Sequence, residues 1–131
     1  MCNSDYETVE VCHTRSRKAC TAHKCQTCRR TILRAETYQE TRWLFEGHWY
    51  TGKLCTHCQV GQRWLIAECG YGPIDGLKDE IHEHAEEYRR LDLWRLLVGM
   101  DRGWARFDGD GFMALPQMPE VTPGAPHNYH A

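Results

Sequence analysis

Four cysteines of this chain are arranged in two pairs that could bind one metal ion. Cys25 and Cys28 form the first C-x2-C pair, and Cys55 and Cys58 form the second after an interval of 26 residues. Zinc in structural sites takes four thiolate or imidazole ligands in a tetrahedron, and a C-x2-C turn presents two thiolates to one ion. We therefore expect one structural zinc ion bound by these four cysteines. Four protein ligands leave no open coordination position, so such a site stabilises a fold and does not activate water.

The other cysteines give weaker patterns. Cys12, His13, Cys20 and His23 are close enough in sequence to raise the alternative of a second metal site, and this alternative stays open. The chain has eight cysteines, no amino-terminal apolar segment typical of a secretory signal and no apolar run long enough to span a membrane. We therefore expect a cytoplasmic protein with no membrane partner, in which thiols stay reduced and structural disulfides are rare.

No histidine motif indicates a catalytic metal. His57 lies within the second cysteine pair and is expected to be a surface imidazole rather than a ligand. His82 and His84 are two positions apart and would point to different sides of a helix, whereas zinc metalloproteases use histidines four positions apart. Cys69 is expected to be a small buried residue near the end of a helix. No catalytic residue is therefore predicted, and the chain is expected not to be an enzyme.

The segment between the two cysteine pairs contains the elements that must position them. Strand-like residues run over 38–45 and 48–54, with a turn signal between them, which predicts a β-hairpin. This hairpin can fold back and bring the two pairs together. Apolar residues at helical spacing follow Cys55, so the second pair is expected at a helix amino terminus, where the helix dipole favours anionic sulfur.

The order of a cysteine knuckle, a hairpin and a helix that carries the second pair resembles the treble-clef zinc finger. The segment KCQTCRRTILRAETYQETRWLFEGHWYTGKLCTHC is also similar to small zinc-finger proteins encoded by tailed phages and prophages. Such proteins often have a glycine after the first C-x2-C and another before the Glu-x-Tyr, where this chain has Arg29 and Ala35. The resemblance covers residues 24–70 and implies a phage or mobile-element origin, but it does not specify a partner.

The rest of the chain adds helices and two tails. Apolar residues recur every three or four positions from Ile74 to Leu91 and continue to Met100, which predicts an antiparallel helical segment. The sequence DGDG at residues 108–111 is a strong turn signal and predicts a short terminal hairpin. The chain is therefore predicted to be a small α+β protein, with a polar arm over residues 1–23, the treble-clef-like zinc module over 24–70, the helical extension with its hairpin over 71–115 and a flexible proline-rich tail over 116–131.

Charged and aromatic residues indicate where a partner would bind. The net charge is −2, so there is no global basic excess, yet residues 15–34 contain seven basic residues and no acid. The candidate partner-binding residues are Arg29, Arg30, Arg34, Arg42, Trp43 and Trp49. The leading hypothesis is a non-enzymatic interaction protein, namely a phage accessory protein that binds and modulates a host protein. Nucleic-acid binding through residues 15–34 is the alternative, and a treble-clef nuclease that uses His48 is less favoured; the oligomeric state stays open.

Overall fold

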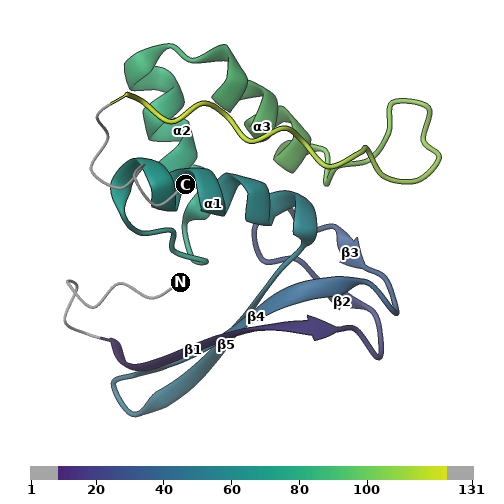
Figure 1. The fold of residues 1–131 in the computed structure, drawn as a ribbon. Helices are drawn as coiled ribbons and strands as arrows, with labels where there is room; N and C mark the ends of the chain where they lie inside the picture. The colour runs from purple at the N-terminus through teal and green to yellow at the C-terminus, as the bar shows by residue number, and fades with distance from the viewer. Residues whose placement is uncertain (1–8, 124–131) are drawn as a thin grey trace.

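The computed structural model describes residues 9–123 and shows an α+β fold with a three-stranded sheet and three helices (Figure 1). Helix α1 lies between the sheet and the other two helices. No helix within the described residues is long and apolar enough to cross a membrane. In chain order the elements are β1 (Val9–Lys18), β2 (His23–Lys24), β3 (Thr31–Ile32), β4 (Thr37–Phe45), β5 (His48–Leu54), α1 (Thr56–Cys69), α2 (Leu77–Tyr88) and α3 (Leu91–Asp101).

The predicted hairpin forms two of the three strands of the sheet, with β4 in the centre and β5 at one edge. Strands β4 and β5 pair antiparallel from Gln39 and Leu54 to Phe45 and His48. The two turn residues between the strands, Glu46 and Gly47, have φ angles of 50° and 79°. Positive φ at both central residues is what a tight hairpin turn of type I′ requires. The hairpin therefore brings the end of β5, and the cysteine that follows it, back to the start of β4.

The segment predicted as a polar amino-terminal arm contains a strand instead. Strand β1 pairs antiparallel with β4 and forms an edge of the sheet. Arg15 and Arg17 each form an ion pair with Glu40 at 3.2 Å, and the hydroxyl groups of Thr14 and Thr41 are 3.1 Å apart. These cross-strand pairs stabilise the strand. Its sequence has no regular alternation of apolar and polar residues, and the sequence pattern therefore predicted an arm. The outer part of that predicted arm, residues 1–8, lies outside the described residues.

The single periodic pattern after residue 73 is divided into two helices. Helix α2 ends at Tyr88. The next residue, Arg89, caps the helix with a left-handed φ of 50°, and Arg90 is extended before α3 begins. The predicted terminal hairpin is reduced to a single bridge between Ala105 and Phe112, around the expected turn. The backbone of residues 108–111 therefore turns as predicted, but no pair of strands extends from it.

The described part of the predicted flexible tail packs against the helices. The indole N–H of Trp64 and the guanidinium of Arg90 both donate to the carbonyl of Glu120, at 3.0 and 2.6 Å. The backbone N–H of Thr122 donates to a carboxylate oxygen of Glu68 at 2.9 Å. Because proline-rich sequences lack a periodic pattern, these hydrogen bonds of residues 116–123 could not be predicted. Residues 124–131 lie outside the described residues.

Gly99 allows a tryptophan to pack against α3. A Cβ atom at this position would overlap the ring of Trp104, which is buried. We expect Gly99→Ala to destabilise the protein by about 1–3 kcal/mol through overpacking, although alanine ordinarily stabilises a helix interior by about 1 kcal/mol relative to glycine. Urea unfolding of this variant checks the effect, with Arg95→Ala at an exposed position of α3 as the control. A Gly99→Ala protein as stable as the wild type would contradict this packing.

Candidate metal centre and binding surfaces

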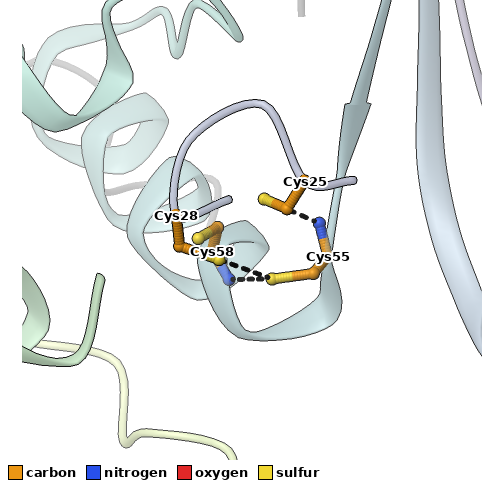
Figure 2. A group of neighbouring side chains, drawn as sticks. All are labelled: Cys25, Cys28, Cys55 and Cys58. Atoms are coloured by element: carbon orange, nitrogen blue, oxygen red, sulfur yellow. Dashed lines mark hydrogen bonds between the residues drawn. The ribbon is translucent and has the colours of Figure 1, made fainter. Parts of the chain in front are cut away.

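The structure brings the four predicted cysteines together in one buried cluster (Figure 2). Cys25 and Cys28 lie in the loop between β2 and β3, while Cys55 is the N-cap residue of α1 and Cys58 lies in its first turn. The four sulfur atoms all lie within 4.8 Å of one another. The cluster could therefore hold one metal ion, and it has the four ligands that a closed site needs.

N–H groups point at the sulfur atoms of the cluster. The backbone N–H of Cys55 donates to the Cys25 sulfur at 3.4 Å, and that of Cys58 donates to the Cys55 sulfur at 3.5 Å. The indole N–H of Trp104 donates to the Cys58 sulfur at 3.3 Å. Such donors stabilise anionic sulfur, which is the form that metals bind. Trp104 could not be predicted as part of the site, because nothing in its local sequence indicates a contact with a cysteine 46 positions away.

Hydrogen bonds among the thiols distribute their protons unevenly. The hydrogen bonds of Cys55 with Cys25, Cys28 and Cys58 lower the pKa of Cys55 well below its usual range. The pKa of Cys25 is lowered to about 7, chiefly by its hydrogen bond with Cys28. Hydrogen bonds with Cys25 raise the pKa values of Cys28 and Cys58. A metal ion must displace the remaining protons, so its binding releases protons and weakens as the pH falls.

A buried guanidinium lies beside the cluster. The Arg30 side chain is 2% exposed and donates two hydrogen bonds to the carboxylate of Glu36, at 2.8 and 3.0 Å. Burial lowers the pKa of Arg30, but the hydrogen bond with Glu36 and the charge of Cys55 raise it overall, so this group stays cationic next to the thiolates. The burial corrects the prediction that Arg30 contacts a partner, because its side chain is not at the surface.

His57, expected to be a surface imidazole, is also buried. Its Nε2–H donates to the carbonyl of Met113 at 2.6 Å, and its Nδ1 accepts a weak hydrogen bond from Arg30 at 3.5 Å. The imidazole stacks on Trp104 with ring centroids 5.2 Å apart. Both ring nitrogens are engaged, so His57 holds the segment after α3 over the cluster and is not a metal ligand.

The structure does not assemble a second metal site in the region that it describes. Among residues 9–123, the four-cysteine cluster is the only group of three or more His, Cys, Asp or Glu side chains placed to hold a metal ion. Cys12 is disulfide-bonded, which the expectation of a fully reduced chain did not anticipate, and Cys20 is an exposed thiol. His13, His23 and His48 therefore belong to no metal-binding group in this part of the chain.

The other residues predicted to contact a partner are at or near the surface. Arg29 and Arg34 are exposed on the loops that flank β3. The guanidinium of Arg42 lies 5.2 Å from the ring centroid of Trp49, and both side chains are exposed. Trp43 is half-buried and packs against the core. Arg29 also has a left-handed φ of 68°, a backbone conformation that glycine adopts more readily than other residues.

One cysteine–histidine pair was not predicted. The Cys69 sulfur lies 3.0 Å from Nε2 of His84, whose Nδ1–H donates to the carbonyl of Glu80 at 2.9 Å, so Nε2 accepts the thiol proton. A nucleophile and its base have this arrangement in cysteine enzymes. Burial and the carboxylates of Glu68 and Glu80, however, raise the pKa of Cys69 to about 11. The thiol therefore keeps its proton at neutral pH and only donates a hydrogen bond to Nε2, and the pair links α1 to α2 rather than providing an activated nucleophile.

An apolar groove lies between α3 and residues 113–120, and its volume is about 750 Å³. We call it the α3 groove. The sequence pattern assigned Trp94 and Val98 to the same apolar stripe as Leu97 and Met100, but only the latter two are buried. Large apolar side chains remain exposed in and around the groove at Leu91, Trp94, Val98, Phe107 and Met118. This surface was missed because the apolar residues of α3 cover more than one face of the helix.

Comparisons with protein-family models, with curated proteins and with solved structures found no match to this chain. The cluster and the surfaces around it are therefore the basis for assigning a function.

Proposed function

We propose that the four cysteines bind one structural zinc ion within a treble-clef-like module. Thiolates at roughly 2.3 Å from zinc form a tetrahedron with edges of roughly 3.8 Å, and the Cys28 and Cys55 sulfur atoms are 3.7 Å apart. The knuckle, the hairpin and the helix that begins at Cys55 follow one another in the order expected for such a module. We also propose a cytoplasmic location, which would keep the cluster thiols reduced and available to the metal. The disulfide of Cys12 would be an exception in that compartment.

On this proposal the chain is a non-enzymatic interaction protein that binds a host protein. A closed site of four thiolates has no position for a substrate or an activated water. The observation that carries the choice of a protein partner is the α3 groove, because large exposed apolar patches on soluble proteins mark interaction sites. The similarity of residues 24–70 to phage-encoded zinc fingers supports a search for this partner in a bacterial host.

The chemistry of the α3 groove favours a partner segment with apolar side chains. Trp94 lies in the groove and is partly exposed, and tryptophan is the residue type most enriched at interface hot spots. Val98 is half exposed one helical turn further along α3. A groove of this size along a helix suits an amphipathic helix of the partner, whose apolar face would cover both side chains.

Substitutions in the α3 groove test this function. We expect Val98→Lys and Trp94→Ala to abolish or strongly reduce capture of a discrete protein from nuclease-treated bacterial lysate, because they remove apolar contact area at the centre of the surface. Lysine is compatible with the carboxyl-terminal half of a helix, so Val98→Lys should fold normally. The measurement is a pull-down with the tagged, zinc-loaded chain, read out by mass spectrometry.

The matched control is Trp49→Ala, which truncates an exposed tryptophan on the sheet. It should leave the capture unchanged. Capture that survives both groove substitutions, or that is lost equally in Trp49→Ala, would contradict the assignment. Sedimentation of the purified chain distinguishes a host partner from a second copy: concentration-dependent dimers that Val98→Lys abolishes would assign the groove to self-association instead.

A further inference from the structure

The sheet has one face that no helix in the described residues covers (Figure 1). Because side chains alternate along paired strands, residues on one face of β4 and β5 include Thr41 and Leu54, which are buried beneath the helical layer. The opposite face, which we call the open face, consists mainly of charged and aromatic side chains. Six of them lie close together on the three strands: Arg15, Arg17, Glu40, Arg42, Trp49 and Lys53.

The open face is strongly cationic. Four of the six named side chains are basic, and the only carboxylate among them is that of Glu40. Arg15 and Arg17 both bind this carboxylate at 3.2 Å, yet their side chains remain 63% and 42% exposed. Although burial raises the pKa of Glu40, the hydrogen bond from Arg15 and the charges of Arg17 and Arg15 lower it overall. Glu40 therefore stays ionised and holds two guanidinium groups in place, while their remaining N–H donors face solvent.

An aromatic platform lies next to these cations. Trp49 is 51% exposed on the open face, and the guanidinium of Arg42 lies 5.2 Å from its ring centroid. The indole is therefore accessible on a sheet surface that is otherwise rich in donors for phosphate. A base has a flat π-face that stacks on such a ring, and an arginine beside the ring adds a cation–π contribution.

The cationic surface continues over the edge of β5. There an open hollow of about 520 Å³ lies next to the cysteine knuckle, the loop that contains Cys25 and Cys28. Lys53 of the open face also lines this hollow. Lys24 and Arg29 contribute further positive charge to its wall, whereas Asp75 is its one carboxylate. The hollow and the open face therefore form one basic path from β1 to the knuckle. Most of the other exposed acids among the described residues lie on α2 and beyond, although Glu46 is exposed in the turn between β4 and β5; they are Asp79, Glu83, Glu86, Glu87, Asp101, Asp108, Asp110 and Glu120.

We propose that the open face and the adjoining hollow bind single-stranded nucleic acid. The arginines and lysines would contact phosphates, and Trp49 would stack on one base. A single strand is favoured over a duplex because stacking on an exposed indole requires an unpaired base. This inference goes beyond the proposed protein-binding function, because it concerns another face of the molecule. It keeps Arg42 and Trp49 from the predicted binding residues, adds Lys53 and leaves out the buried Arg30.

Fluorescence anisotropy of the full, zinc-loaded chain tests the proposal. The probes are labelled single-stranded RNA and single-stranded DNA of about 12 nucleotides, with a duplex of the same length for comparison. We expect binding to one or both single strands that is tighter than to the duplex. With about four phosphates contacted, the logarithm of the association constant should fall with the logarithm of salt concentration with a slope of about −3.

Three variants separate stacking from charge. Trp49→Ala should weaken binding about tenfold at an unchanged salt slope, and Trp49→Phe should restore most of the affinity. The double variant Arg42→Glu, Lys53→Glu should weaken binding and make the slope shallower by about 1.4. Arg95→Glu reverses one charge at an exposed position of α3, which is half the charge change of the double variant. It is the control and should leave the affinity within about twofold, because only long-range charge is altered.

Several results would overturn the proposal. These are the absence of binding, equal or tighter binding to the duplex, an unchanged affinity in Trp49→Ala, or an equal loss in Arg95→Glu. Labelled polyglutamate is included as a probe for an acidic protein, and tighter binding to polyglutamate than to either single strand would assign the face to such a partner instead. Thermal unfolding of each variant excludes a loss caused by misfolding. The assay contains no protein partner for the α3 groove, so its result is independent of the pull-down.

Discussion

Replacing Cys25 with serine is expected to unfold the chain at neutral pH. The substitution removes one of four ligands from a cluster at the centre of the core, where the sulfur atoms are buried together. Binding of structural zinc contributes about 10–16 kcal/mol to the folding of small zinc domains, whereas a domain of this size has a net stability of about 5–15 kcal/mol. Loss of the metal should therefore leave no stable fold, and a strong chelator should have the same effect on the wild type.

The measurement combines metal analysis with circular dichroism. The wild type should contain one zinc ion per chain and unfold cooperatively, while Cys25→Ser should contain none and show no cooperative transition. Iron in place of zinc would give a coloured protein and would contradict the proposed metal, although not the cluster. Cys20→Ser is the matched control, because this thiol is exposed and outside the cluster. A chelated wild type that keeps its fold would show that the core does not need a metal.

The cluster could be predicted because a metal site depends on residue types and on short spacings between ligands in the sequence. Two C-x2-C pairs around a hairpin signal sufficed to identify all four cysteines that the structure brings together. The hairpin itself followed from strand-like residues around a turn, and its register agrees with that pattern. The α+β class follows from these elements together with the periodic apolar residues of the helices.

The features that escaped prediction depend on contacts between segments distant in sequence. Strand β1 is stabilised by ion pairs across to Glu40, 23 and 25 positions from its arginines. Trp104 donates a hydrogen bond to Cys58, which is 46 positions away in the chain. His57 donates to the carbonyl of Met113, which is 56 positions away. Because a single sequence shows residue types and local periodicity but not such pairings, it cannot tell a buried arginine such as Arg30 from an exposed one such as Arg29.

Glu36→Ala is expected to destabilise the protein strongly, by about 3–5 kcal/mol. It leaves the guanidinium of Arg30 buried without its carboxylate partner, next to the ring of Phe112, which lies 4.4 Å away. Part of that charge can still be balanced by the cysteine thiolates, which places the expected effect toward the lower end of the range. Urea unfolding of the zinc-loaded protein measures the loss.

The control for Glu36→Ala is Asp101→Ala, which removes the acid of the exposed ion pair with Lys78. Exposed pairs contribute about 0–1 kcal/mol, so the two variants should differ several-fold in their effect. Equal effects would show that Arg30 does not depend on its carboxylate. Glu36→Gln, which keeps an acceptor oxygen, should lose less than Glu36→Ala.

The pH dependence provides an independent test of the same pair. The hydrogen bond from Arg30 lowers the pKa of Glu36 in the folded state, in spite of partial burial. A carboxyl group with a lowered folded pKa contributes its full stability above the unfolded pKa, near 4.3, and loses it as the pH falls through the folded value. The stability difference between the wild type and Glu36→Gln should therefore be constant above about pH 5.5 and shrink below about pH 4.5. Acid also releases the metal, but the stability lost in this way is the same in both proteins and cancels in the difference between them. A stability difference that stays constant through this pH range would mean that Glu36 is not ionised in the folded protein.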